Sequence, residues 1–430
     1  MSSEIGCDVR DIDVDREKGL IALLSKEGEK SLWRWGSFGP ERLSDDVAEK
    51  FSDRFSKWGK ESESSDLELL FTGDIILQGE LLNADLEDVL RDLSPLFQKA
   101  DFLGGNLEGP LVFQHPSGSF PLYRYPARTA EVLKKIGFGL LELSNNHILD
   151  GGHEGLESTL HILSQAGIQP IGVRQSGDSP FYLYEKNGIS VAFTAYTYEN
   201  PPLVTGGRSY PSLNGHPIMP AWRDRLDSFP GLLREADFEE TVALLSRRAA
   251  AMKEAGADLL VFCLHWGEEY QDFPDEKQKE LAERLCEAGV DLLLGTHPHL
   301  PQPMELLESA NGKHRMIAYY SLGNFLSLQK PGTLCPSPLL ESGVIARIMI
   351  GKEGGEARIK SADYLPIYML KDMKTVEEDK VFFGRLLLLS DEEISRLKPE
   401  DYELPIPTAE SLQALKMAIE SRLGSPIPLP

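Results

Sequence analysis

Short apolar runs alternate with amphipathic stretches from residue 67 onward, and this alternation predicts an α/β layered domain. Apolar residues recur at three and four positions in three stretches, which predicts helices over residues 154–166, 238–255 and 275–288. The core domain is expected over residues 66–370. The predicted strands have the sequences LELLFTG, FGLLELS, ISVAFTAY, ADLLVFCLHW, VDLLLGTH and RMIAYYSLGNF.

Both ends of the chain follow a different pattern. Residues 1–65 contain one short strand-like run, residues 19–24, and then a charged, serine-rich stretch, so we interpret them as an N-terminal appendage with a linker. Residues 371–430 combine acidic, helix-like segments with a proline-rich end, PIPLP. They are expected to form a C-terminal helical tail without a role in chemistry.

The charge balance limits the partners of the protein. The 430 residues include 44 Lys and Arg against 68 Asp and Glu, which gives a formal net charge of −24. Because this charge repels nucleic-acid phosphates and anionic bilayers, we expect no nucleic-acid partner and no membrane insertion. An anionic small molecule or polymer can still bind where bound cations reverse the local field.

The first residues are charged and contain no apolar export segment, so a cytoplasmic protein is expected. The four cysteines are widely spaced and form no CxxC pair, which argues against a disulfide framework.

Three predicted strands end in potential metal ligands. LELLFTG leads into Asp74, ADLLVFCL into His265, and VDLLLGT into His297 and His299. An Asp after a strand is by itself more often a turn or cap residue. However, the carboxyl ends of strands in an open α/β sheet face the binding crevice, so the joint occurrence favours one site. On an extended segment His297 and His299 would point the same way, and Pro298 would stiffen the backbone.

The segment DFLGGNLEGP, residues 101–110, is interpreted as a glycine-rich loop that carries Asn106 and Glu108. A simple surface turn is the alternative. A dinuclear metal site needs a carboxylate that can span two cations, and Glu108 is the best-placed candidate for this role.

The segment LSNNHILDGGHEG follows a predicted strand and contains an amide and an imidazole side by side. Asn146 offers a hard oxygen ligand, and His147 can donate a proton to a leaving group. Asp150 can orient His147 or cap the following helix, and both remain open. The alternative is that Asn145 and Asn146 only turn the chain and that His147 is an ordinary loop histidine.

The mixture of imidazole, carboxylate and amide donors favours a borderline divalent ion, Mn, Zn or Fe, with one or two ions bound. The remaining histidines are interpreted as solvated or packed side chains; these are His115, His153, His161, His216 and His314.

These motifs resemble the CapA family, the poly-γ-glutamate capsule biosynthesis proteins of the calcineurin-like metallophosphoesterase superfamily. The resemblance covers residues 67–330, in the order in which the family has them. It rests on TGDIIL, GNLEGPL, LSNNHILDGGHEGLESTLHIL, GIQPIGV, LHWGEEY, GTHPHLPQPME and YYSLGNF.

The resemblance implies a four-layer α/β/β/α sandwich of two mixed sheets with short appendages at both ends. It also implies that Asp74 and His299 bind one metal, that Asn146, His265 and His297 bind the other, that Glu108 binds both, and that His147 is the proton donor. The superfamily has Asp-x-His in its first motif, but Ile76 stands at that histidine position. The first site is therefore expected to bind its ion more weakly.

Further residues are expected to support the site. Arg124 and Arg128 precede a helix and could bind an anionic substrate, or they could be solvated surface residues. Asn324 is expected to support a ligand loop, while Trp266 and Tyr270 are expected to pack. The substrate-binding candidates are Asn106, Asn145, Arg124 and Arg128.

Together these features predict a hydrolase in which a metal-activated water attacks a phosphoester or a γ-glutamyl amide. The alternative is a non-catalytic assembly or transport factor that binds an anionic polymer such as poly-γ-glutamate through its metal site.

Overall fold

The computed structural model describes residues 66–232, 234–332, 335–376 and 379–428, together with four strands among the first 65 residues. It divides the chain into two compact units, Met1–Ser65 and Asp66–Pro430. In the first unit the four strands form an antiparallel sheet in chain order. The predicted run at residues 19–24 corresponds to the second of them, and the serine-rich stretch lies outside the described residues. The strands are β1 (Val9–Asp15), β2 (Leu20–Ser25), β3 (Lys30–Gly36) and β4 (Gly39–Arg42).

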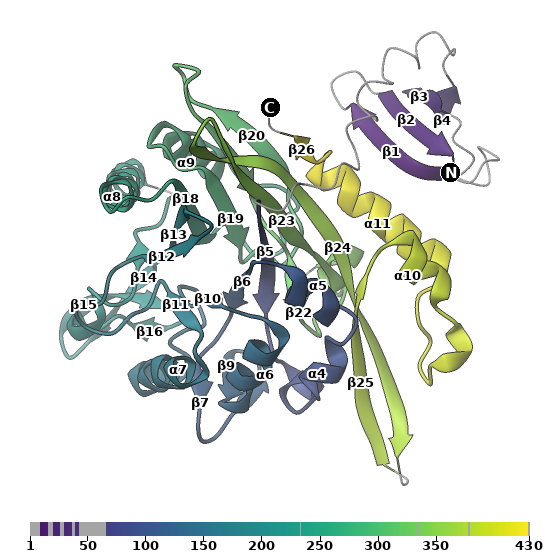
Figure 1. The fold of residues 1–430 in the computed structure, drawn as a ribbon. Helices are drawn as coiled ribbons and strands as arrows, with labels where there is room; N and C mark the ends of the chain where they lie inside the picture. Colours follow the sequence, from purple (N-terminus) through teal and green to yellow (C-terminus); the bar gives the residue numbers. More distant parts are fainter. Residues whose placement is uncertain are drawn as a thin grey trace. The chain divides into compact units, whose positions relative to one another are not determined.

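The second unit is built on two mixed sheets, as the family resemblance implies (Figure 1). The first sheet has the order β11-β10-β6-β5-β23-β24-β25, with β22 paired to β5 and β26 paired to β24. The strands from β11 to β5 are parallel, and β23 to β25 are antiparallel. Their bounds are β5 (Leu67–Ile75), β6 (Phe102–Leu107), β10 (Leu140–Glu142), β11 (Gln169–Ile171), β22 (Asn324–Leu326), β23 (Ser342–Glu353), β24 (Glu356–Val376), β25 (Asp379–Leu388) and β26 (Ile427–Pro428).

The second sheet has the order β12-β13-β18-β19-β21-β20, with β17 paired to β13. Its four central strands are parallel, and both edge strands are antiparallel to their neighbours. The apolar runs predicted as strands fall on β5, β10, β13, β18, β19 and β21. The bounds are β12 (Tyr182–Lys186), β13 (Ile189–Tyr198), β17 (Ser228–Phe229), β18 (Leu259–His265), β19 (Leu292–Thr296), β20 (Met304–Glu308) and β21 (Arg315–Tyr319).

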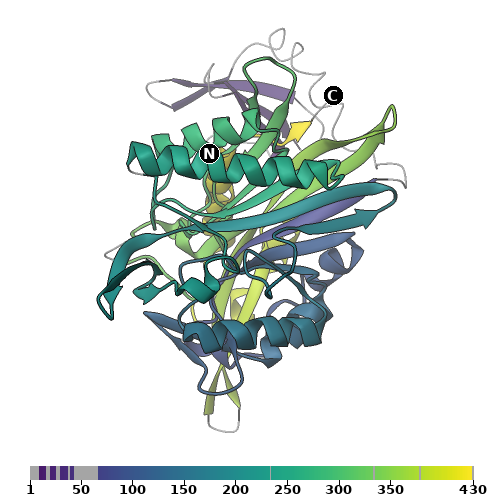
Figure 2. The same ribbon diagram turned by 90° about the vertical axis from the view of Figure 1, so that its left-hand side faces the viewer.

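Three buried apolar clusters hold these layers together. One lies between the sheets and combines Phe71 of β5 with Phe193 of β13, whose rings stack with centroids 6.1 Å apart. A second packs four helices, α4 to α7, against the outer face of the first sheet. A third packs α8 and α9 against the outer face of the second sheet, where they lie side by side (Figure 2). The helices are α4 (Leu86–Val89), α5 (Ser94–Lys99), α6 (Arg128–Ile136), α7 (Gly152–Ala166), α8 (Glu235–Glu254) and α9 (Glu276–Glu287).

The three predicted helices correspond to α7, α8 and α9 within a few residues. The start of α9 is fixed by a capping box, in which the Asp275 side chain accepts from the Gln278 amide and the Gln278 side chain accepts from the Asp275 amide. None of the helices that the structure describes has the length and apolar character needed to cross a bilayer.

The segment 101–110 is not the glycine-rich loop that the sequence suggested, because most of it forms β6. Its glycines serve close packing of strands: a Cβ on Gly104 would lie 2.5 Å from the Phe71 ring, and one on Gly105 would lie 2.1 Å from Thr72 Oγ1. Asn106 therefore stands on a strand, and Glu108 follows that strand directly.

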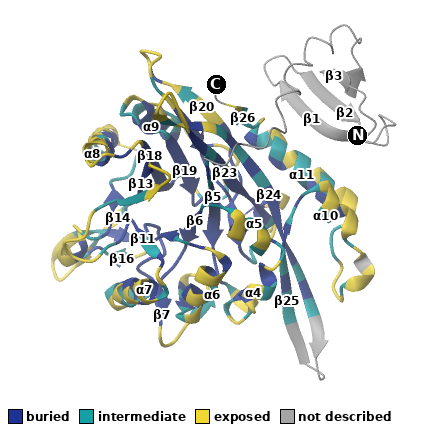
Figure 3. Cartoon of the chain, viewed as in Figure 1, coloured by how far each residue is buried: buried dark blue, intermediate teal, exposed yellow. Residues whose placement is uncertain are grey.

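The C-terminal residues belong to the core of the second unit. The boundary expected near residue 370 falls within β24, and β25 pairs with β24 along its length up to Val376. Helix α10 (Asp391–Arg396) follows, and α11 (Ala409–Leu423) buries Leu412 and Ile419 in the cluster between the sheets. The described residues from 382 to 428 thus add to the packed core, and Figure 3 shows α11 with buried positions beside β24.

Two small sheets flank the carboxyl ends of the central strands. The first comprises β7 (Leu111–Val112), β8 (Ser117–Ser119) and β9 (Leu122–Pro126), and the second comprises β14 (Asn200–Thr205), β15 (Arg208–Leu213) and β16 (His216–Pro217).

Candidate metal centre

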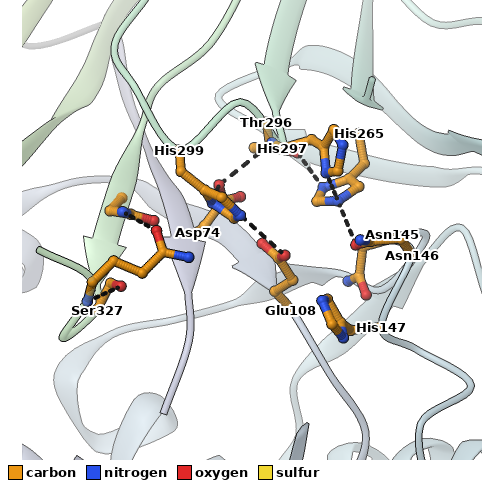
Figure 4. A network of polar contacts seen from close by, with 12 residues as sticks. Asp74, Glu108, Asn145, Asn146, His147, His265, Thr296, His297, His299 and Ser327 are labelled. Carbon is orange, nitrogen blue, oxygen red and sulfur yellow. Dashed lines mark hydrogen bonds and ion pairs between the residues drawn. The ribbon is translucent and has the colours of Figure 1, made fainter. Parts of the chain in front are cut away.

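The six predicted ligands converge where parallel strands of both sheets end (Figure 4). Asp74 lies near the end of β5 and Glu108 just after β6, whereas His265 ends β18 and His297 follows β19. These side chains are buried. The sequence argument that strand ends bring the donors together agrees with this arrangement.

Asp74, Glu108 and His299 form one cluster whose donor atoms all lie within 4.8 Å of one another. His299 Nδ1 is 3.0 Å from Asp74 Oδ2, and its Nε2 is 3.8 Å from Glu108 Oε1. One imidazole and two carboxylates thus surround a common point.

Glu108, His265 and His297 form a second cluster by the same distance limit. His265 Nε2 lies 3.1 Å from His297 Nδ1 and 2.9 Å from Asn146 Oδ1. Glu108 belongs to both clusters, so its carboxylate stands between two sets of donors.

The two histidines around Pro298 are not on an extended segment, in contrast to the sequence prediction. Their φ angles are 99° for His297 and 60° for His299, in a region that L-residues adopt rarely. The chain bends here instead of continuing β19, and the two rings reach different clusters. His297 points towards His265, and His299 points towards Asp74.

Asn106 and Asn145 hold the ligand segments together. Asn106 Nδ2 donates to Asp74 Oδ1 at 2.8 Å, and Asn145 Nδ2 donates to Asn106 Oδ1 at 3.0 Å and to the Leu107 carbonyl at 2.8 Å. Both side chains are fully buried. This geometry favours a positioning role over the contact with substrate that the sequence suggested.

His147 lies beside the centre and is oriented by its neighbours. Its Nδ1 is 2.7 Å from Asp150 Oδ2, while Asp150 also accepts from the Tyr123 amide at 2.7 Å and from Asn214 Nδ2 at 2.9 Å. The cap of α7 is Gly151 and carries no side-chain hydrogen bond. Of the two roles open to Asp150, the structure therefore favours orientation of His147.

Burial sets the protonation of the centre when no cation is bound. Burial first, and then the nearby Asp74, raises the pKa of Glu108 well above its usual value. Burial lowers the pKa values of His265 and His297 well below the ordinary range, and neighbouring imidazoles lower them further. A bound cation would offset these costs, because it stabilises the ionised Glu108 carboxylate and binds neutral imidazoles.

The residues present fit a divalent metal. Glu108 Oε1 is buried and has no hydrogen-bond partner among the described residues. A buried acceptor without a partner is costly unless an ion or water satisfies it. Together with two imidazoles and an amide oxygen nearby, it matches the donor set of a borderline ion such as Mn, Zn or Fe.

Several supporting residues escaped the sequence analysis because they are distant from the motifs. The Tyr198 hydroxyl lies 2.9 Å from His297 Nε2, and Thr296 Oγ1 lies 3.0 Å from His265 Nδ1. Asn214 and Tyr123 come from the two small flanking sheets. The pattern ISVAFTAYTY signals only a buried strand, and nothing in it marks Tyr198 as a partner of a histidine.

The two arginines that are candidates for substrate binding have no direct contact with the centre among the described residues. Arg128 begins α6 and donates to the Leu82 carbonyl at 3.0 Å. Arg124 alternates along β9 with Tyr123 and Tyr125, of which Tyr125 donates to the Glu108 carbonyl, so Arg124 leaves the strand on the other face. Among the described residues, no hydrogen bond or ion pair joins either arginine to the centre.

The remaining expectations concern packing. Trp266 is buried and donates from Nε1 to the Tyr320 carbonyl at 3.1 Å, and Asn324 Nδ2 donates to the Leu340 carbonyl at 2.9 Å beside β5. Ile76 is fully buried in the apolar cluster under α4 to α7. Tyr270 is half-buried, with its ring 5.8 Å from that of His299.

Residues 68–329 match the family described as "Bacterial capsule synthesis protein PGA_cap". The chain is similar to the "Capsule biosynthesis protein CapA" of Bacillus anthracis, with 28% identity over 62% of this chain and 61% of the relative. It is also similar to the "PGA biosynthesis protein CapA" of Bacillus subtilis (strain 168), with 28% identity over 60% of this chain and 62% of that protein. The match thus spans about three fifths of these curated relatives.

A shorter match is to a "Probable polyglutamine synthesis accessory protein" of Mycobacterium tuberculosis, with 30% identity over 38% of this chain and 40% of the relative. Among solved structures, the calcineurin-like phosphoesterase YfkN from Bacillus subtilis aligns with a TM-score of 0.35 and 13% identity, over 83% of this chain and 97% of that one.

Proposed function

The chain belongs to the family of bacterial capsule synthesis proteins, PGA_cap, and from this premise we propose that it is a divalent-metal-dependent hydrolase linked to poly-γ-glutamate or related capsule metabolism. The observation that supports this proposal most directly is the pair of donor clusters that share Glu108.

Each side chain has a role in this proposal. Asp74 and His299 would hold one ion, Asn146, His265 and His297 the other, and Glu108 both. A bound divalent ion supplies Lewis-acid chemistry: it polarises the scissile group and lowers the pKa of a coordinated water. Ile76 supplies no donor, so we infer that the site of Asp74 and His299 is the weaker one.

His147 would protonate the leaving group. Because its Nδ1 faces Asp150, Nε2 is the ring nitrogen that can deliver a proton. Asp150 would fix the orientation and tautomer of the ring, as a carboxylate beside a catalytic imidazole does. Such general-acid assistance typically contributes between about a hundredfold and about ten-thousandfold in rate.

The proposed substrate is anionic, and it carries either a phosphoester or a γ-glutamyl amide. The buried carboxylates give the centre a negative potential when it holds no cation, so substrate binding would depend on metal loading. This dependence separates substrate binding at the centre from binding elsewhere on the surface.

A non-catalytic role is the second candidate. Two of the relatives are named biosynthesis proteins, and a third is named an accessory protein. In this case the metal centre would hold carboxylates of an anionic polymer without turnover. A screen of phosphoesters and γ-glutamyl peptides on metal-loaded protein distinguishes the two, because only the hydrolase releases product.

Two substitutions test the proposed roles. Glu108→Ala should lower both metal content and turnover, because it removes the donor common to both clusters. His147→Gln should retain the metal but lose activity by roughly a hundredfold to ten-thousandfold. The loss should be smaller for a substrate with a good leaving group, which needs little protonation. Metal content by mass spectrometry and steady-state kinetics measure the two effects.

His161→Gln is a matched control, since this exposed histidine lies on α7 away from the centre. It should leave both metal content and rate unchanged. Loss of metal in His147→Gln together with retention in Glu108→Ala would reverse the two roles and refute the mechanism.

A further inference from the structure

A polar cavity of about 310 Å³ lies between β13 and α8. We call it the arginine pocket and define it by six lining residues: Arg174, Tyr196, Arg223, Asp227, Arg247 and Arg248. Four arginines at one cavity are unexpected in a chain with a net charge of −24.

The deepest charges of the arginine pocket are a triad with one positive charge in excess. Asp227 Oδ2 accepts from Arg174 at 2.6 Å and from Arg248 at 3.2 Å. Only 16%, 7% and 11% of the side chains of Arg174, Asp227 and Arg248 are exposed. A largely buried cation without its own counter-ion is unfavourable, so this triad favours the arrival of an anion.

Tyr196 contributes a hydroxyl without a partner. Its oxygen is buried and forms no hydrogen bond with any described residue, and the Arg248 guanidinium lies 5.0 Å from the centre of its ring. Buried tyrosine hydroxyls usually find a partner. The Tyr196 hydroxyl lacks a partner and belongs to a residue that lines a cavity with several guanidinium groups. An acceptor oxygen of a bound anion would satisfy it.

The other charges of the arginine pocket lie nearer to solvent. Arg247 is exposed and forms no ion pair with any residue that the structure describes, whereas Arg223 pairs with Glu199. The carboxylates of Asp224 and Glu240 also line the cavity, but both side chains are exposed, where water and salt screen them. The buried excess of positive charge is therefore not cancelled at the rim.

We propose that the arginine pocket binds a small oxoanion, either a phosphate or a carboxylate group. Arg174 and Arg248 already donate to Asp227, and Arg248 also donates to Thr194 Oγ1 at 2.8 Å, so they supply mainly positive charge. The planar guanidinium of Arg247 presents paired donors that match both groups, and the Tyr196 hydroxyl adds a further donor. This site is separate from the metal centre, and the proposal stands whether or not the chain is a hydrolase.

An anion bound here would touch a segment that also supports the metal centre. The Asp227 carbonyl accepts from the Ser144 hydroxyl and from the Thr197 amide at 3.3 Å. Ser144 immediately precedes Asn145 and Asn146, and the Thr197 hydroxyl donates to the His265 carbonyl at 3.3 Å. Occupancy of the arginine pocket would thus steady the strand ends that carry two proposed ligands.

Calorimetric titration of metal-free protein tests the proposal, because the carboxylates of the metal-free centre repel anions. Inorganic phosphate is one probe and γ-glutamylglutamate is the other, so the two arms distinguish the sources of the oxoanion. Tyr196→Phe and Arg247→Gln should each weaken binding of the preferred probe by roughly tenfold, the loss of one charge-assisted or buried hydrogen bond. Arg315→Gln, which removes an exposed arginine paired with Glu308, should leave binding unchanged.

Thermal unfolding adds a readout that a purely structural role of Tyr196 would not give. Without anion, Tyr196→Phe should unfold at the same temperature as the wild type or higher, since it removes an unsatisfied hydroxyl. Phosphate should raise the unfolding temperature of Tyr196→Phe by less than it raises that of the wild type. Tyr184→Phe is the control, because that hydroxyl donates to the Asp101 carbonyl at 2.9 Å and lines a different cavity. Absence of binding for both probes, or binding that both pocket variants retain in full, overturns the proposal.

Discussion

Tyr198 shows how a residue without a motif can support a metal ligand. Its hydroxyl lies 2.9 Å from His297 Nε2, so the other ring nitrogen, Nδ1, is the one available to an ion. Outer partners of this kind fix the tautomer and orientation of a ligating imidazole. Tyr198→Phe should therefore weaken the ion at His265 and His297 by roughly tenfold to a hundredfold in titrations with Mn or Zn.

Tyr320→Phe is the matched control, because the hydroxyl of Tyr320 contacts Glu305 and not a ligand. An unchanged affinity in Tyr198→Phe would mean that the backbone alone holds His297 in place.

Asp291 predicts a pH effect on stability. Burial raises its pKa from the ordinary value of 3.8 to about 6. Between these pH values the folded protein holds a proton that the unfolded chain has released, so stability decreases as pH rises from about 4 to about 6. Asp291→Asn removes this titration, and its stability relative to wild type should grow by up to about 3 kcal/mol over that window.

Chemical denaturation at a series of pH values measures this effect. Asp258→Asn is a close control. Asp258 and the Ser190 backbone are joined by the same pair of hydrogen bonds that joins Asp291 to the Leu260 backbone, but the Asp258 side chain is exposed. A parallel pH profile for both variants would contradict the assignment to Asp291.

Asp74, His265 and His297 could be found from sequence because each follows an apolar run, and strand ends meet at one edge. The residues that orient them could not. Asn214 lies in the β15–β16 turn, 67 positions from His147 and yet 3.2 Å from its Nδ1. Only the packing of the small sheet of β14 to β16 makes this contact.

At the level of elements, β5 and the segment before β22 approach each other closely beside Asp74. A Cβ on Gly73 would lie 1.9 Å from the Gly323 carbonyl oxygen, and this same oxygen accepts from the Asp74 amide at 3.0 Å. Gly73→Ala should displace Asp74 from His299, lower metal occupancy of that cluster and destabilise the fold by about 1–3 kcal/mol.

Metal analysis and thermal unfolding measure the two effects. Gly139→Ala is the control, because a Cβ there meets its nearest atoms at 3.9 Å and should be tolerated. Full metal occupancy in a folded Gly73→Ala protein would show that the strands can separate without cost to the centre.

The elements that the sequence predicted well are those with a local signature. Helix α9 has its capping residues, and β18 is one continuous apolar run. By contrast, β24 and β25 mix apolar and charged residues without a regular period, and the acidic segments around them suggested helices. Their strand character comes from mutual pairing, with Leu370 opposite Arg385, which no local pattern reveals. Likewise, the glycines of β6 suggested a loop because their close contacts with Phe71 and Thr72 are long-range.

For the whole molecule, the net charge of −24 implies sensitivity to salt. Self-repulsion destabilises the compact state, and salt shortens the range of this repulsion from about 30 Å at 0.01 M to about 8 Å at 0.15 M. Metal-free protein should therefore unfold at a temperature about 1 °C higher at the greater ionic strength for each kcal/mol gained, because a chain of this length has a large unfolding entropy.

Differential scanning calorimetry in NaCl and in KCl measures the shift, and equal shifts in both salts show that it arises from screening. A lower unfolding temperature at the higher ionic strength would indicate that local ion pairs, rather than net repulsion, dominate the electrostatic energy.

The place of β5 in the first sheet affects how the protein can fold during its synthesis. β5 is the first strand of the second unit to be synthesised, but it pairs with β6 on one side and β23 on the other. The entire second sheet is translated before β23 emerges. Until then one edge of β5 lacks its partner, and apolar residues such as Phe71 lack part of their cover. We therefore expect the first sheet to form during synthesis only after β23 has left the ribosome.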